Sequence, residues 1–232
     1  MSDGPRRVAV LAPMPSELRP VVRAMELARL EDAPLHSGRV GAVDVVAART
    51  GMGLDLAAAA TARVLDAAAV DHVLVVGIAG GLGPSRIGDL VCPETVIDRA
   101  SGRDFTATAL SAARGSISSS DEFLVDPERV AALAAAGVLA VDMETAAVAA
   151  VCTERGVAWS AVRVISDIAT DHPDDSVLDL ANPDGSPRVW DGLRFMATHP
   201  RRIPMLVRMG RDSTRAAQAA AAEATRQLRA LG

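Results

Sequence analysis

Aromatic residues are scarce in this chain. Its 232 residues include three Phe, two Trp and no Tyr, so aromatic residues make up 2% of the sequence. Binding of single-stranded nucleic acid through rows of stacked rings is therefore not expected. Lysine is absent as well, so all 24 basic residues are arginine, and the net charge is −5. An acidic chain with no basic footprint is not expected to bind duplex nucleic acid either.

Signals for disulfides, metals and membranes are also missing. The two cysteines, Cys92 and Cys152, lie far apart and outside any C-x-x-C motif, which is typical of buried thiols in a reducing compartment. The four histidines are scattered, so we expect no metal site, and no cofactor is expected. No apolar run reaches the roughly 18 residues of a membrane span, and no signal peptide is recognisable. These absences predict a cytoplasmic protein.

The sequence does contain a regular alternation of short apolar runs and helical segments. Strands are predicted at residues 8–12, 35–40, 43–48, 73–76, 89–97, 115–118, 138–141 and 158–165. Helices are predicted at residues 16–27, from 54 to about 69, from 126 to about 135, 142–154 and 203–231. This alternation predicts an α/β fold with a largely buried sheet. We expect residues 1–232 to form a single domain, with a C-terminal helical extension from about residue 188.

Polar residues stand where predicted strands end. Glu17 follows the first strand, and Asp142 and Glu144 follow a middle one. Arg163 interrupts the last apolar strand, which Asp167 closes, and a charge there is almost never buried unpaired. Ligands of open α/β sheets bind at the carboxyl ends of strands. Three carboxylates and one arginine at that edge suit cleavage of a glycosidic bond, in which one acid protonates the leaving group and another prepares a water.

Each of these features also has a purely structural interpretation. Glu17 alone is typical of a solvated helix residue, and Ser166-Asp167 is typical of a helix N-cap. The segment Gly77–Gly81 is typical of a tight turn after a strand, and it matches no dinucleotide or phosphate-loop motif. If Asp142 and Glu144 are helical, their side chains point about 200° apart, so only one of them is expected to face the crevice.

Six short blocks follow one another between residue 7 and about residue 170. They are Ala12-Pro13-Met14-Pro15-Ser16-Glu17, Thr50-Gly51-Met52-Gly53, Gly77-Ile78-Ala79-Gly80-Gly81, Ser120-Asp121-Glu122-Phe123, Val141-Asp142-Met143-Glu144-Thr145-Ala146-Ala147 and Arg163-Val164-Ile165-Ser166-Asp167. In this order they resemble the purine nucleoside phosphorylase and nucleosidase superfamily, and within it the methylthioadenosine/S-adenosylhomocysteine nucleosidases. The resemblance implies a three-layer αβα sandwich with a central mixed sheet, a purine nucleoside as the small-molecule partner, and a homodimer.

The resemblance also implies a role for each site residue. Asp167, held by Ser166, is expected to donate a proton to N7 of the purine, and Glu17 to activate the attacking water with help from Arg163. Glu144 is expected to hold the ribose hydroxyls. The remaining substrate-binding residues are expected to be Met143 on the sugar, Phe123 and Leu124 on the purine, and Ile78, Ala79, Gly80, Met14 and Met52 along the pocket.

The nucleophile is the next question. Phosphorylases of this superfamily place an Arg just before the glycine segment and a Ser within it, whereas Val75-Val76-Gly77-Ile78 offers neither. Because a phosphate dianion needs charge-assisted donors, hydrolysis is favoured, with adenine released from a 5′-substituted adenosine.

Three alternatives stay open. One is a phosphate-dependent phosphorylase of the hopanoid-associated branch, whose tail the segment 182–231 resembles and whose substrate carries a large apolar 5′ group. Another is a non-catalytic nucleoside-binding protein. The third assigns the arginines of the tail to anionic lipid headgroups, although a solvated helical face is the simpler interpretation.

Overall fold

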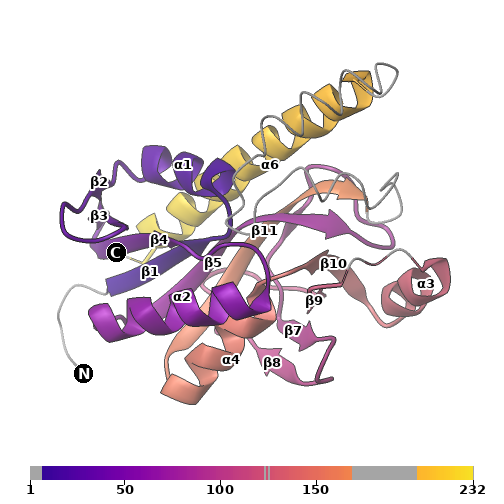
Figure 1. Ribbon diagram of the computed structural model, residues 1–232, viewed down its shortest axis with the longest axis horizontal. Coiled ribbons are helices and arrows are strands. Elements are labelled where there is room, and N and C mark those ends of the chain that lie inside the picture. The colour runs from indigo at the N-terminus through magenta and orange to yellow at the C-terminus, as the bar shows by residue number, and fades with distance from the viewer. Residues whose placement is uncertain (1–6, 123, 125, 169–202, 232) are drawn as a thin grey trace.

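The computed structural model describes residues 7–122, 124, 126–168 and 203–231. In this part of the chain an 11-stranded mixed sheet lies between helices that cover its two faces (Figure 1). The strands are β1 (Arg7–Ala12), β2 (Ala28–Arg29), β3 (Leu35–Val40), β4 (Val43–Arg49), β5 (His72–Gly81), β6 (Leu90–Val91), β7 (Thr95–Asp98), β8 (Asp104–Thr106), β9 (Ser116–Ser119), β10 (Val138–Asp142) and β11 (Ala158–Ile168). The helices are α1 (Pro15–Ala24), α2 (Leu54–Ala67), α3 (Pro127–Ala135), α4 (Thr145–Arg155) and α6 (Ile203–Arg229).

Parallel pairing brings the ends of several strands to one edge of the sheet. β1 is parallel to β4 on one side and to β5 on the other, and β5 is parallel to β11. β10 runs against β5 and pairs only with its last residues, Gly80 and Gly81. The end of β10 therefore lies beside the end of β5. Strands β9 and β7 continue from β10 in parallel, so their ends open on the same side.

Side chains of the central strands alternate between two apolar cores. In β1, Val8 and Val10 pack with α1 and α6, whereas Ala9 and Leu11 pack with α2 and α4. Aliphatic residues make up most of both cores, and Phe105 and Trp159 belong to the core on the α2 and α4 side. The period of two places alternate residues on opposite faces. The predicted three-layer αβα sandwich with a central mixed sheet is confirmed.

The long C-terminal helix belongs to one of these layers. The second half of α6 packs against α1, β5 and β11, and its buried residues are Ala216, Ala217, Ala220, Ala221, Ala224 and Leu228. The alanines let this helix approach the sheet closely. The first residues of the predicted extension, 188–202, lie outside the described part of the chain. The division of the chain into domains stays a prediction.

Three local predictions need correction. Gly77–Gly81 is not a turn, because β5 continues through it to Gly81. The helix predicted from Asp142 begins three residues later, at Thr145. Ser166-Asp167 does not cap a helix, because both residues lie inside β11. The helix predicted from residue 126 is present as α3, and Asp126 caps it by accepting a hydrogen bond from the Glu128 backbone N–H at 3.0 Å.

The described residues include neither a candidate membrane span nor a metal-binding cluster. None of their helices combines the length and the apolar character that crossing a bilayer requires. Nor do three or more His, Cys, Asp or Glu side chains of this part of the chain gather in a way that would hold a metal ion.

Candidate active site

A cavity of about 210 Å³ opens where β5, β10 and β11 end. Most of the residues that the sequence assigned to a site line it: Met14, Glu17, Met52, Ile78, Ala79, Gly80, Leu124, Met143, Glu144, Ser166 and Asp167. Arg163 lies behind this lining, fully buried. Phe123 lies outside the described residues, so its predicted place on the purine stays a prediction.

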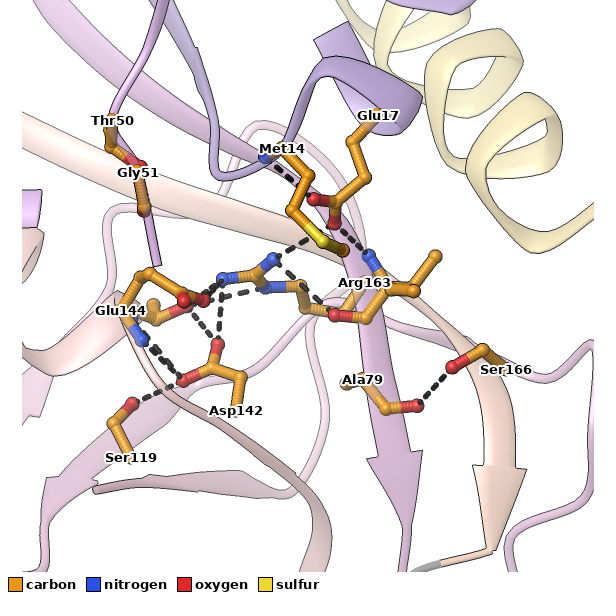
Figure 2. Close-up of polar contacts among 12 residues, drawn as sticks. Met14, Glu17, Thr50, Gly51, Ala79, Ser119, Asp142, Glu144, Arg163 and Ser166 are labelled. Carbon is orange, nitrogen blue, oxygen red and sulfur yellow. Dashed lines mark hydrogen bonds and ion pairs between the residues drawn. The ribbon is translucent and has the colours of Figure 1, made fainter. Parts of the chain in front are cut away.

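Arg163 holds together three carboxylates from three different parts of the chain (Figure 2). Its Nη2 lies 2.8 Å from Asp142 Oδ2 and 3.5 Å from Glu144 Oε2, and its Nη1 lies 3.9 Å from Glu17 Oε1. Nη2 also donates to Thr145 Oγ1 at 2.9 Å. A buried guanidinium is tolerated only when charge and hydrogen bonds are satisfied in this way. The side chains of all three acids are less than 10% exposed.

A glycine makes room for this cluster. Arg163 in β11 pairs with Gly77 in β5, and both positions are on the face that α2 and α4 cover. A Cβ atom at Gly77 would lie 2.5 Å from Arg163 Nη1 and would also overlap the Glu17 carboxylate. The absent side chain therefore allows protein groups to approach the strand, a use of glycine in a strand that differs from a turn.

Glu17 reaches the cluster from the first turn of α1. One carboxylate oxygen accepts the Met14 backbone N–H and the other accepts the Ile78 backbone N–H, each at 2.9 Å. The residue is only 2% exposed, so its interpretation as a solvated helix residue is wrong. Burial raises the pKa of Glu17 to about 7, although the Arg163 charge and both backbone N–H groups act in the opposite direction. Glu17 therefore has a carboxyl group that gains and loses a proton near neutral pH.

Asp142 and Glu144 both face Arg163, contrary to the prediction that only one would face the crevice. That prediction assumed a helix, but both residues precede α4. Asp142 Oδ1 accepts a hydrogen bond of 2.5 Å from Ser119 Oγ, and the Glu144 and Thr145 backbone N–H groups at 3.3 and 3.2 Å. Asp142 thus fixes the start of the helix as well as the guanidinium.

The two carboxylate oxygens of Glu144 have different partners. Its Oε1 accepts the Gly53 backbone N–H at 3.1 Å, and its Oε2 is the oxygen nearer Arg163. Burial raises the pKa of Glu144 to about 8 against the lowering effect of Arg163, and the charges of Asp142 and Glu17 raise it further. Such a carboxyl group is expensive to desolvate unless a ligand hydroxyl replaces the lost water.

Asp167 also lines the cavity, beside an irregularity in β11. The register shifts between Ile165 and Asp167, so that Asp167 pairs with Gly80 and Ser166 is the extra residue. Such bulges re-aim side chains beside active sites. The Ser166 hydroxyl donates to Asp167 Oδ1. It also lies 3.5 Å from the Ala79 carbonyl oxygen, as Figure 2 shows. Asp167 and Ser166 therefore both lie at the cavity wall.

Several residues of the site were not predicted from the sequence. Arg99, Ser120 and Glu122 line the cavity, and Thr145 and Ser119 hold Arg163 and Asp142. The sequence carries a signal for Thr145, which follows Glu144 in the same block. It carries no signal for Arg99, whose surroundings come from strands that are distant in sequence.

Comparison with known proteins connects this arrangement to a family. The family model for the Phosphorylase superfamily matches residues 7–112 and 103–184. The chain belongs to the phosphorylase superfamily. Within this superfamily it is 31% identical over 199 residues to the 5′-methylthioadenosine/S-adenosylhomocysteine nucleosidase of Geobacillus kaustophilus, an alignment that covers 70% of this chain and 85% of the relative. The corresponding enzyme of Geobacillus thermodenitrificans is 29% identical over the same length.

Several solved structures share this fold. The S-adenosylhomocysteine nucleosidase of Streptococcus pyogenes superimposes with a TM-score of 0.74 at 17% identity, over 100% of both chains. The futalosine hydrolase of Helicobacter pylori superimposes with a TM-score of 0.69 at 20% identity, over 97% of both chains. At these identities the likeness concerns the fold, and the two names show that one fold in this superfamily serves enzymes named for different substrates.

Proposed function

We propose that this chain is a purine nucleosidase that hydrolyses the N-glycosidic bond of a 5′-substituted adenosine and releases adenine. One observation carries the proposal: the Arg163 cluster holds Glu17 and Glu144 at the same cavity that Asp167 also lines. Two separately placed acids are what cleavage of a glycosidic bond requires. The named relatives, which are nucleosidases, support the same reaction.

The proposed reaction divides the proton transfers between Asp167 and Glu17. As the bond between C1′ and N9 breaks, its electron pair moves into the purine, and Asp167 donates a proton to N7. Water attacks C1′ and gives a proton to Glu17, whose raised pKa suits a base that works near neutral pH. Glu144 accepts hydrogen bonds from the ribose hydroxyls. The carboxylate of Glu17 favours the positive charge that develops on the sugar.

The other predicted residues would surround the nucleoside. Met143 packs on the sugar, with Met14 and Met52 along the wall that adjoins it. Leu124, with Phe123, would bind the purine. Ile78, Ala79 and Gly80 supply the backbone beneath the ligand, and Ser166 orients Asp167. No cofactor takes part in this scheme.

Water rather than phosphate is supported by what occupies the glycine segment. The Ile78 backbone N–H donates to Glu17, so this donor is already satisfied by a carboxylate. The space above Gly77 is filled by the same carboxylate and by Arg163. A phosphate dianion at this position would meet Glu17 instead of unpaired donors, and the repulsion disfavours its binding.

The proposal extends to the setting of the enzyme. We infer a single-domain homodimer in the cytoplasm, on the strength of the family resemblance and of the composition. The chain has a mass of 24.0 kDa. Sedimentation velocity of the purified protein at micromolar concentration is expected to give twice this mass. A monomer at that concentration would contradict this part of the proposal.

Adenine release is the decisive measurement. Purified protein is incubated with 5′-methylthioadenosine, S-adenosylhomocysteine or adenosines with larger apolar 5′ groups, with and without phosphate, and free adenine is followed by chromatography. We expect release without phosphate, and a loss of about 10²–10⁴-fold in the variant Asp167→Asn. The control is Asp66→Asn, since Asp66 forms an exposed ion pair with Arg155 and does not line the cavity. Strict dependence on phosphate would indicate a phosphorylase, and tight binding without turnover would indicate a binding protein.

A further inference from the structure

Arg99, a basic residue of the cavity lining, has no part in the mechanism above. Arg99 is the only basic residue among the described residues that line the cavity, where the other charged residues are Glu17, Glu122, Asp142, Glu144 and Asp167. A cation in an acidic site that already contains the buried Arg163 cluster calls for a separate explanation.

The sheet determines where Arg99 enters the cavity. Asp98 ends β7 and is aligned with Ser119 of β9, which is aligned in turn with Asp142 of β10. The residues that follow these three, Arg99, Ser120 and Met143, all line the cavity. The backbone N–H of Arg99 donates to the Ser119 carbonyl at 3.0 Å and so continues the ladder by one more bond. Arg99 is therefore anchored on a rigid strand end.

The guanidinium contacts the segment that we assign to the base. Arg99 Nη2 donates to the carbonyl oxygen of Glu122, the residue before Phe123. This segment is also held by Leu54, whose backbone N–H donates to Asp121 Oδ1 at 2.7 Å, and by a bond from the Glu122 backbone N–H to Ser120 Oγ at 3.0 Å. Partial burial of the side chain lowers the pKa of Arg99, and the nearby Arg129 acts in the same direction. Arg99 thus lies against the Glu122 backbone, in the segment that the proposed function assigns to the base.

Donor chemistry decides what such a residue recognises. A guanidinium has five N–H donors in a planar fork and no acceptor, so it cannot accept a hydrogen bond from the exocyclic amino group of adenine. It can donate to the oxygen at the same position of a 6-oxopurine. The pairing of arginine with O6 and N7 of guanine, and of asparagine or glutamine with adenine, follows the same rule in nucleic acids.

We propose that Arg99 recognises the 6-position of the base and extends the substrate range of this site to 5′-substituted 6-oxopurine nucleosides. This inference rests on the proposed function, because it assigns the base end of the same cavity. The guanidinium holds Glu122 with one N–H and offers another to O6, while Asp167 protonates N7 of the departing base.

The test compares two substrates that differ only at the 6-position. The ratio of kcat/KM for 5′-methylthioinosine to that for 5′-methylthioadenosine is measured for the wild type and for Arg99→Gln. Glutamine offers both a donor and an acceptor, so the ratio is expected to fall by about tenfold or more. The control is Arg103→Gln, since Arg103 lies over the Phe105 ring at 5.0 Å and does not line the cavity.

A binding measurement separates this inference from the proposed reaction. Calorimetric titration of the free bases hypoxanthine and adenine needs no turnover, and hypoxanthine is expected to lose affinity in Arg99→Gln by about the same factor. If the wild type cleaves neither nucleoside, the proposed function fails, and base binding still decides the role of Arg99. The inference is overturned if the wild type neither binds hypoxanthine nor cleaves the inosine, or if Arg99→Gln weakens both bases equally. Equal weakening would mean that Arg99 only holds the Glu122 segment.

Discussion

Arginine has two contrasting environments in this protein. Arg163 is fully buried and meets three carboxylates. A second, larger cleft of about 830 Å³ lies between α1, α2 and the β3–β4 hairpin. Its exposed arginines are Arg19, Arg23, Arg29, Arg49 and Arg63, and no Asp or Glu is among the described residues that line it.

The cavity and the cleft are lined by neighbouring residues of one segment, but they differ in what solvates the charge of their arginines. Pro13, Met14 and Glu17 line the cavity, and the neighbouring Pro15 and Leu18 line the cleft. Water reaches the exposed arginines of the cleft, so their charge does not depend on buried carboxylates. Arg163 has lost its water, and three carboxylates and the Thr145 hydroxyl take its place. Burial therefore separates the two environments, and the buried arginine is the one that brings three carboxylates together in a site.

The largest expected effect comes from removing the buried charge. Arg163→Met leaves Glu17, Asp142 and Glu144 buried without a cation, so the free energy of unfolding should fall by about 3–5 kcal/mol, with loss of adenine release. The matched change in the cleft, Arg63→Met, should alter stability by no more than about 0.5 kcal/mol. Urea unfolding of both variants measures the difference. Similar losses in the two variants would show that burial does not separate the two regions.

The next effect concerns the space around Arg163. Gly77→Ala places a methyl group against Arg163 and Glu17, and overpacking of this kind costs about 1–3 kcal/mol. Gly210→Ala is the control, because a Cβ at this position of α6 meets no heavy atom within 4 Å. There the better helix propensity of alanine should raise stability by about 0.5–1 kcal/mol. Opposite signs in thermal unfolding are therefore expected, and a neutral Gly77→Ala would disprove the tight fit.

Features that depend on neighbouring residues in the sequence could be predicted, whereas contacts between distant strands could not. The alternation of apolar and helical segments predicts the three-layer fold, because periodicity depends on neighbouring residues alone. An arginine inside an apolar strand predicts a buried partner for the same reason. Asp142, Glu144 and Asp167 were placed at strand ends by the same reasoning, and the structure brings all three to one cavity.

Pairing between distant strands was not accessible from the sequence. The glycines of β5 were expected to form a turn because glycine favours turns locally, whereas the requirement for Gly77 comes from Arg163 in β11. Arg99 reaches the cavity because β7, β9 and β10 are in register, which no local pattern encodes. The burial of Glu17 is also not predictable from its own helix, because its contacts with Ile78 and Arg163 come from other strands.

A smaller effect appears in the pH dependence of the cluster. Glu144 has a pKa of about 8 in the folded protein against an ordinary value of 4.5. Between these values the folded state binds more protons than the unfolded state, so this residue makes the wild type less stable as pH rises. Glu144→Gln removes the titration and keeps an acceptor for Gly53. The stability of the variant relative to the wild type should therefore increase from pH 5 to pH 8 in scanning calorimetry. A constant difference would contradict the raised pKa.

The smallest effect belongs to the cleft. Arg19 and Arg23 are four residues apart on α1, where like charges repel by about 0.2–0.5 kcal/mol. Arg19→Gln should raise the free energy of unfolding by that amount at low salt, because Arg19 is the one farther from the favourable C-terminal end of the helix. The gain should vanish at about 1 M salt, where screening acts over about 3 Å. A gain that survives high salt would mean that Arg19 is not solvated, and the cleft would then resemble the Arg163 cluster more closely than its lining suggests.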